Sequence, residues 1–594
     1  MMNKRHFDFS IAVGGAAGQG VATPGNVLAR IFARRGLHFY AYNAYQSIIR
    51  GGHSFLTVRV CDRQVRTHGD RLDVLIALNQ DTMNRHLKHM GPGTWVIFNS
   101  DSIRPGEGVR GVQFCPMPVK ELSGDSRNRL VQNTAAISTV LSILGLDFGP
   151  FEEVLTQQFQ HKGQEVVDAN VAIARKSYEY AREHFPPFPG KVPSGTKPLA
   201  IWRGNDAIAM GGAAAGVKFY CAYPMSPSSG ILHWMAQNAR DLDIMVRQAE
   251  DEISVINMAI GAAHAGCRAM CATSGGGFAL MTEALGSAGM MEIPVLVVDA
   301  QRAGPSTGLP TKTEQGDLWQ VLGAGQGDYP RLVAAPKDPL DAFNTVPEMF
   351  NLLDRLQCPG ILLSDELLSD ETSTVDPAMI NLHPEIDRGD LIMKPSESNG
   401  YLRFKLTESG ISPRAVPGLQ GYEHVVATDE HQEDGGLISD EFTNPRKRKA
   451  MLEKRQRKLE SIEDVIAPPE LEGPKEADVT LVGWGSTHGV IEEAREQLKD
   501  DGITANHLQI KWIVPFHARE VTEILSRSRR TIFVENNFSG LFYRYMRSET
   551  GLDGDGHIRK YDGEPFMPHH VADGVKAILS GETARYVPLH ELEV

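Results

Sequence analysis

The chain has 594 residues and a formal net charge of −14, with 41 % hydrophobic and 23 % charged residues. This composition is typical of a soluble globular protein, and the length predicts several domains. The acidic balance argues against nucleic acid as a partner, because phosphate binding needs a basic face. No stretch approaches 18 consecutive apolar residues, so we expect no membrane span and a cytoplasmic protein.

The six cysteines are spread through the chain, and none forms a CxxC pair. Their spacing supports neither a structural zinc site nor an iron–sulfur cluster. We therefore expect small buried apolar side chains in a reducing compartment. The positions are Cys61, Cys115, Cys221, Cys267, Cys271 and Cys358.

Two linkers, at 186–198 and 444–474, divide the chain into three parts, 1–185, 199–443 and 475–594. The first linker is rich in proline. The second begins with a basic run, PRKRKAMLEKRQRKLE, which we expect to form a solvated helix.

Each part alternates short apolar strands with amphipathic helices, a pattern that predicts three α/β domains with mainly parallel sheets. In chain order, the expected strands are 7–15, 54–60, 72–78, 94–100, 218–222, 268–273, 294–300, 479–486, 508–514 and 531–537. The expected helices are 24–36, 129–145, 206–217, 252–266, 278–289, 488–502 and 518–528.

A glycine-rich turn, GGAAGQGVAT, lies between the first strand and the first helix. Gly15, Gly18 and Gly20 let backbone N–H groups approach an anion at a helix N-terminus. Their GxxGxG spacing differs from the dinucleotide motif, so the turn indicates a phosphate-bearing or other anionic ligand, or simply a tight turn. A second turn, RGGHS, places Arg50 where it can line the same crevice or merely reverse the chain.

Two motifs of the middle part follow strand ends. YPMSPSSG, at 223–230, joins a strand to a helix, and we expect Ser228 and Ser229 to cap that helix. Farther on, Glu250, Asp251 and Glu252 head a helix that is otherwise almost entirely apolar, which predicts a buried helix. Its carboxylates either offset the helix dipole or sit at a core edge with shifted pKa values.

A third motif, VDAQRAGPSTGLPTKTEQGDL, occupies 298–318 and begins where an apolar strand ends. Open α/β sheets bind ligands at the carboxyl ends of their parallel strands. Arg302 at this position is suited to bidentate recognition of a carboxylate, although a structural ion pair is an equal alternative.

Together the motifs resemble the 2-oxoacid:ferredoxin oxidoreductases. YPMSPSS is similar to that family's YPITPSS signature, and the flanking GNDAIAMGGAAAG, EDEISVINMAIGAAHAG, ATSGGGFALMTEALG and QRAGPSTGLPT resemble its α subunit in the same order. GGAAGQGV…RGGHSFLTVRV resembles its γ subunit, and VTLVGWGS…VENN resembles a transketolase C-terminal domain. The order is that of the fused large subunit, with a pyrimidine-side thiamine-diphosphate domain in the middle.

The resemblance implies that a 2-oxoacid is decarboxylated on thiamine diphosphate, that coenzyme A takes the acyl group, and that a [4Fe–4S] cluster passes electrons to ferredoxin. It assigns Glu252 to the aminopyrimidine of the cofactor, with Glu250 as the competing choice. The same resemblance assigns Arg302 to the substrate carboxylate, Ser226 (in place of the family's Thr) to a substrate hydrogen bond, and Thr311 to the same site. Coenzyme A would contact the glycine-rich turn, through Gly15, Gly18, Gly20 and Arg50.

The chain lacks cysteines spaced for a cluster, and its GDG at 554–556 has no Asn at the distance that binding of the cofactor diphosphate requires. The resemblance therefore implies a partner β subunit that brings the cluster and Mg²⁺, in an α₂β₂ heterotetramer. No metal ligand is expected in this chain.

The fused architecture favours 2-oxoglutarate as substrate, in either the oxidative or the reductive, CO₂-fixing direction. A pyruvate or broad-range 2-oxoacid enzyme is the alternative within the family. A non-catalytic subunit that binds coenzyme A or nucleotide, or that is purely structural, is the alternative outside it.

Overall fold

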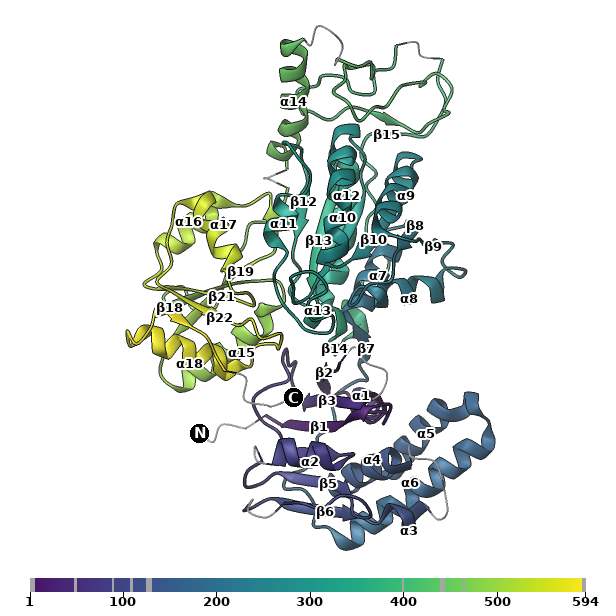
Figure 1. The fold of residues 1–594 in the computed structure, drawn as a ribbon, viewed down its shortest axis with the longest axis vertical. Coiled ribbons are helices and arrows are strands. Elements are labelled where there is room, and N and C mark those ends of the chain that lie inside the picture. Colours follow the sequence, from purple (N-terminus) through teal and green to yellow (C-terminus); the bar gives the residue numbers. More distant parts are fainter. Residues whose placement is uncertain are drawn as a thin grey trace.

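The computed structural model describes residues 6–46, 51–87, 90–106, 110–123, 131–397, 400–438, 444–462 and 465–589. Three large sheets organise this part of the chain (Figure 1). Most strand pairs in the second and third sheets are parallel, as the alternation of strands and helices predicts. None of the described helices is long and apolar enough to cross a bilayer.

The first sheet has the strand order β6-β5-β4-β1-β3-β2-β14-β7. Its strands are β1 (Asp8–Ala17), β2 (His38–Ala44), β3 (Gly51–Cys61), β4 (Val74–Ala77), β5 (Trp95–Asn99), β6 (Gln113–Met117), β7 (Ala200–Arg203) and β14 (Thr372–Val375). Its helices are α1 (Ala22–Arg34), α2 (Gln80–His86), α3 (Val119–Ser123), α4 (Val131–Ile143), α5 (Phe148–Phe159) and α6 (Gln164–His184). The half from β1 to β6 is parallel, whereas β3, β2, β14 and β7 are joined by antiparallel pairs.

The middle sheet has the order β20-β12-β13-β11-β10-β8-β9. Its strands are β8 (Val217–Ala222), β9 (Met245–Gln248), β10 (Arg268–Thr273), β11 (Leu296–Gln301), β12 (Leu332–Ala334), β13 (Gly360–Asp365) and β20 (Trp512–Val514). Its helices are α7 (Gly204–Ala214), α8 (Ser229–Asn238), α9 (Glu252–His264), α10 (Gly275–Met291), α11 (Leu318–Leu322), α12 (Pro339–Leu356) and α13 (Glu366–Asp370). The apolar runs of β10 and β11 are fully buried, as expected for strands covered on both faces.

The third sheet has the order β17-β19-β18-β21-β22-β23. Its strands are β17 (Leu471–Glu472), β18 (Val479–Trp484), β19 (Ala505–Ile510), β21 (Thr531–Glu535), β22 (Gly556–Arg559) and β23 (Arg585–Tyr586), and its helices are α15 (Thr487–Asp500), α16 (Ala518–Ser526), α17 (Leu541–Thr550) and α18 (Pro568–Leu579). The single strand expected over 508–514 is instead two strands in different sheets, because β20 leaves β19 and pairs antiparallel with β12. Lys511 marks the crossing, where its carbonyl accepts from the backbone N–H of Ala335 at 2.8 Å.

The basic run forms helix α14 (Pro445–Glu460), which lies toward the top of Figure 1. A small parallel pair of strands, β15 (Leu391–Ile392) and β16 (Arg414–Ala415), precedes it in the chain. Our expectation of a solvated helix is wrong, because Lys454, Arg455 and Lys458 are all buried. The Lys454 Nζ donates to both carboxylate oxygens of Glu292, at 2.6 and 2.8 Å. The Lys458 Nζ adds a third bond to the same carboxylate at 2.6 Å, so α14 is fastened to the end of α10 by charge.

Five of the six cysteines are buried, as expected, but Cys267 is exposed. It lies in the turn between α9 and β10, after Gly266, whose φ of +99° is in the left-handed region. Cys267 is exposed because α9 ends at the surface of the protein and the turn that follows it lies there.

Candidate active site

Four loops meet at the carboxyl edge of the middle sheet, after β8, β9, β10 and β11, which are neighbours in that sheet. Parallel strands expose their carboxyl ends on the same edge, which is where open α/β sheets bind ligands. The loops after β8, β9 and β11 carry Ser226, Glu252 and Arg302, and the loop after β10 leads into the glycines that begin α10.

Glu252 occupies the first position of α9, fixed there by the preceding N-cap. The Asp251 carboxylate accepts the backbone N–H of Ser254 at 2.7 Å, which starts the helix and turns Glu252 toward the protein. Glu252 is only 4 % exposed, whereas Glu250 is exposed. The buried Oε1 of Glu252 has no hydrogen-bond partner among the described residues.

The N-terminus of α10 forms a cradle for this carboxylate. A Cβ at Gly277 would lie 2.5 Å from Oε1 of Glu252 and 2.1 Å from Oγ1 of Thr273. Only glycine therefore leaves room for the carboxylate here. An unpaired, buried carboxylate oxygen in a glycine cradle fits a group that donates a hydrogen bond to it, because such an oxygen is unfavourable without a donor.

Arg302 reaches back across the sheet to the turn after β8. Its Nη1 donates to the backbone carbonyl of Ser226 at 2.8 Å. Ser226 is half-buried. Its turn is held by Asn205, whose Nδ2 donates to the Pro227 carbonyl at 2.9 Å. Burial lowers the pKa of Arg302, and the nearby Asp317 carboxylate opposes that shift.

Ser228, one of the two serines expected to cap α8, behaves differently. Ser228 is at the N-cap position, but its hydroxyl donates to the Met225 carbonyl at 2.8 Å and makes no capping bond to the helix. Our capping prediction for Ser228 is therefore wrong. The bond instead closes the YPMSP turn on itself, which rigidifies the loop that presents Ser226.

Two carboxyl groups that we did not single out in the sequence lie beside this cluster. Asp299 on β11 is fully buried, with both oxygens unpartnered among the described residues. Burial raises the pKa of Asp317 to about 6, while the positive charge of Arg302 acts to lower it. The pKa of Asp299 is also raised, by burial and by the negative charge of Asp317. A Cβ at Gly275 would lie 2.4 Å from Oδ2 of Asp317, so this carboxyl group packs under the start of α10.

Thr311 points to a different neighbour. It is buried, and its hydroxyl donates to the carbonyl of Tyr45 in the first domain at 2.8 Å. Within the described part of the chain, Thr311 makes no hydrogen bond to Ser226, Glu252 or Arg302. Its contact with substrate stays a prediction, while its observed role is to join the first two domains.

The glycine-rich turn of the first domain follows β1. Gly18 and Gly20 have φ values of +89° and +74°, which require glycine, and Gly15 ends the regular β1–β3 register opposite Ser54. The Gln19 side chain closes the turn by accepting from the backbone N–H of Ala16 at 2.7 Å. Arg50 lies outside the described residues.

Two features of the site escaped the sequence analysis. Gly277 belongs to SGGG, and a run of glycines at a helix start is a signal for close approach that we passed over. The second is the surface of α9, which we expected to be buried all round. Ile253 and Met258 are instead 50 % and 47 % exposed.

Comparisons with known proteins agree with this arrangement. Family models match three consecutive stretches of the chain: pyruvate ferredoxin/flavodoxin oxidoreductase over 10–180, the thiamine-diphosphate-binding domain of pyruvate flavodoxin/ferredoxin oxidoreductase over 210–451, and the transketolase C-terminal domain over 471–541.

Among similar proteins, the alpha subunit of 2-oxoacid:ferredoxin oxidoreductase 2 from Aeropyrum pernix is 32 % identical, over 98 % of this chain and 99 % of its own. The 2-oxoglutarate oxidoreductase subunit KorA from Mycobacterium tuberculosis is 31 % identical, over 90 % and 85 %. A solved 2-oxoglutarate:ferredoxin oxidoreductase from Magnetococcus marinus superposes with a TM-score of 0.89, at 32 % identity, over 96 % of this chain and 99 % of that one. The chain belongs to the family of 2-oxoacid:ferredoxin oxidoreductase alpha subunits.

Proposed function

We propose that the chain is the large subunit of a 2-oxoglutarate:ferredoxin oxidoreductase, which converts 2-oxoglutarate and coenzyme A to succinyl-CoA and CO₂, or runs the reverse carboxylation. The observation that carries the proposal is the meeting of Glu252, Ser226 and Arg302 at one sheet edge. The similar structure from Magnetococcus marinus has 2-oxoglutarate, coenzyme A and succinyl-CoA bound.

The site fits thiamine diphosphate on its pyrimidine side, because Glu252 offers a buried, unpaired Oε1 beside the Gly277 cradle. When bound, this cofactor supplies the stabilisation of negative charge that decarboxylation of a 2-oxoacid needs. Glu252 would hold a proton at its Oε1 and exchange it with the aminopyrimidine of the bound cofactor, which is general acid–base catalysis. Its burial excludes water from that proton.

We assign substrate binding to Arg302 and Ser226 because of the charge of the one and the hydroxyl of the other. Arg302 is placed to bind the 1-carboxylate of a 2-oxoacid, in a charge-assisted pair of about 1.5–3 kcal/mol. Because one Arg302 nitrogen already binds the Ser226 carbonyl, the guanidinium is oriented before substrate arrives. The Ser226 hydroxyl, in the turn that Arg302 contacts, then donates a hydrogen bond to the keto acid.

The remaining cofactors need a second chain, in our proposal a β subunit that holds the [4Fe–4S] cluster, Mg²⁺ and the diphosphate end of the cofactor, in an α₂β₂ assembly that reduces ferredoxin. Support comes from apolar side chains left exposed on the two helices that begin at the site. Ile253 and Met258 on α9, and Leu280 on α10, are each about half exposed. A partner covering this face would also close the site.

Coenzyme A is proposed to lie at the turn containing Gly15, Gly18 and Gly20. Ala17, at the start of this turn, pairs with Gly51 at the beginning of β3. The segment that leads into β3 also contains Tyr45, whose carbonyl accepts a hydrogen bond from Thr311 of the middle domain. We therefore place the turn near the junction of the two domains. Coenzyme A bound at this turn would therefore be close to the domain that carries Ser226 and Arg302.

The proposal is tested with the chain co-expressed with its partner and purified without oxygen. CoA-dependent reduction of ferredoxin is measured with 2-oxoglutarate and with pyruvate. We expect kcat/KM for 2-oxoglutarate to be larger by about tenfold or more, a discrimination of about 1.4 kcal/mol. A higher kcat/KM for pyruvate would overturn the choice of substrate but leave family membership intact. The comparison is needed because some relatives are named only as 2-oxoacid enzymes, without a specific substrate.

A further inference from the structure

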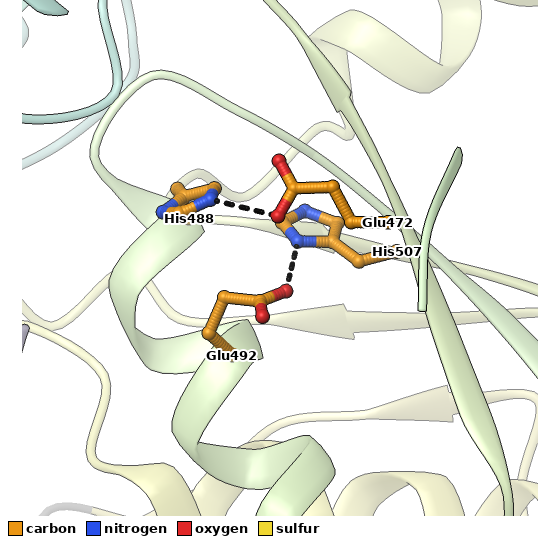
Figure 2. Close-up of side chains that lie close together, drawn as sticks. All are labelled: Glu472, His488, Glu492 and His507. Atoms are coloured by element: carbon orange, nitrogen blue, oxygen red, sulfur yellow. Dashed lines mark hydrogen bonds and ion pairs between the residues drawn. The ribbon is translucent and has the colours of Figure 1, made fainter. Parts of the chain in front are cut away.

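Four side chains that the reaction does not use converge in the third domain (Figure 2). Glu472 on β17 and His507 on β19 are directly opposite each other in an antiparallel pair. His488 and Glu492 are four residues apart on α15, and therefore lie on one face of that helix. The strand pair and the helix face bring two histidines and two glutamates together.

The distances suit a single small ion. One ligand atom from each of the four residues lies within 4.8 Å of every other. The His507 Nδ1 is 2.9 Å from Oε1 of Glu492, and the His488 Nε2 is 3.4 Å from Oε2 of Glu472. The latter is long for a hydrogen bond, but it equals the ligand–ligand edge of about 3.3–3.5 Å in a tetrahedron with metal–ligand distances of about 2.0–2.1 Å.

Both histidines have a nitrogen that the described residues leave unsatisfied. The His507 and His488 side chains are 0 % and 3 % exposed, and Nε2 of the first and Nδ1 of the second are buried without a hydrogen-bond partner. The other ring nitrogen of each histidine, Nδ1 of His507 and Nε2 of His488, is the one that faces a carboxylate of the cluster.

Two cations hold the carboxylates from outside the cluster. The Lys337 Nζ is 3.3 Å from Oε1 of Glu472, and the Arg495 Nη1 is 2.5 Å from Oε1 of Glu492. Arg495 is itself fixed, because its Nε donates to the Ala505 carbonyl at 3.0 Å. Such outer contacts orient ligating carboxylates, while their positive charge weakens the attraction for a cation. An ion held here therefore depends on the two imidazoles.

We propose that Glu472, His488, Glu492 and His507 form a four-coordinate site for a divalent transition-metal ion of the zinc class. Mixed imidazole and carboxylate ligands suit Zn²⁺, whereas Mg²⁺ and Ca²⁺ prefer oxygen alone. With four protein ligands the site has no open position, so its role is structural. The ion ties β17, which lies near the end of the second linker, to α15 and β19.

The test uses the full-length, untagged chain, stripped with a chelator and then incubated with Zn²⁺. After desalting, we expect about one Zn²⁺ per chain by mass spectrometry and a higher Tm than for the stripped protein. Loading with Co²⁺ in place of Zn²⁺ is expected to give the visible absorption of tetrahedral cobalt. His488→Gln and His507→Gln are each expected to weaken binding by at least about tenfold.

The matched control is His557→Gln, which removes a histidine of β22 outside the cluster and is expected to retain full binding. Glu472→Gln provides a milder variant, because this residue is on an edge strand and half-buried, so it tests the site even if a histidine variant fails to fold. Absence of Zn²⁺ uptake overturns the proposal, and so does uptake that persists in His488→Gln, His507→Gln and Glu472→Gln alike.

Discussion

Arg302 and Ser226 are joined directly, although they follow strands that are separated by β10 in the middle sheet. The Arg302 Nη1 donates to the Ser226 carbonyl at 2.8 Å, so the guanidinium is held to the backbone of the turn that carries the Ser226 hydroxyl. A ligand that binds either residue is therefore positioned relative to the other.

Arg302→Lys is expected to raise KM for the 2-oxoacid by about tenfold or more. Lysine keeps the charge but loses the planar fork, and so cannot hold Ser226 and a carboxylate at once. The loss corresponds to a charge-assisted bond of about 1.5–3 kcal/mol. Steady-state kinetics of the assembled enzyme measure it, with the exposed Arg240→Lys as control. Unchanged KM would remove Arg302 from the substrate site.

Ser226→Ala separates the hydroxyl from the turn that carries it. The turn is closed by the Ser228 hydroxyl and by Asn205, so it is expected to keep its shape. We expect a higher KM or a lower kcat for the 2-oxoacid, equivalent to one hydrogen bond of about 0.5–1.5 kcal/mol, with Tm unchanged. Ser229→Ala, at the first position of α8, is the control, and identical kinetics for both variants would leave Ser226 a purely structural residue.

Glu252→Gln is expected to lower kcat by about 10²–10⁴-fold, because the amide cannot exchange a proton with the cofactor. Glu250→Gln is the matched control, since it is two residues away but exposed. Full activity in Glu252→Gln, or an equal loss in Glu250→Gln, would refute the assignment. Iron content of the complex, measured in parallel, shows whether assembly is preserved.

Gly277→Ala tests the cradle by crowding the carboxylate. The new methyl group would lie 2.5 Å from Oε1 of Glu252 and must displace it. Gly276→Ala makes the same change one residue earlier, where the nearest atom to the new Cβ is the Ser306 carbonyl oxygen at 3.9 Å. In an assay of ferredoxin reduction, we expect kcat to fall strongly in Gly277→Ala and to stay near the wild-type value in Gly276→Ala. Equal activities of the two variants would contradict the cradle geometry.

Glu292→Gln is expected to cost about 3–5 kcal/mol of unfolding free energy, because it leaves Lys454 and Lys458 buried without a counter-ion. Glu453→Gln on α14 is the control: its pair with Lys449 is exposed, and we expect a change within about 0.5 kcal/mol. Denaturant titration compares the two, and similar midpoints would contradict a stabilising role for the Glu292 cluster.

The pH dependence of the same variant has a definite sign. Burial, offset by Glu292, lowers the pKa of Lys454 to about 7, below its value of about 10.4 in an unfolded chain. The unfolded state thus binds more protons between these values, so stability rises with pH through this window. Without the carboxylate the lysine pKa falls further, so the difference in stability between wild type and Glu292→Gln is expected to narrow as the pH rises from about 6 to about 8. A difference that widens over that window would contradict this account.

Local chemistry made part of this structure predictable. Glu252 heads its helix because Asp251 caps it, and Gly18 and Gly20 adopt positive φ values where the sequence predicts a turn. Partners distant in sequence were not predictable. The pattern of α14 is the same whether Lys454 faces water or Glu292, and nothing local in 508–514 shows that Trp512 leaves one sheet for another.

The pairing of β14 with β2 has a consequence for synthesis. Thr372 lies opposite Ala41, and Ser373 opposite Tyr40, so the free side of β2 is paired only by residues made more than 300 positions later. While the ribosome is translating the middle part, β2 presents unpaired backbone groups of the kind that recruit other chains. The fused chain is therefore most open to misassembly until β14 emerges, and a nascent product truncated before Thr372 would aggregate more readily than one truncated after Val375.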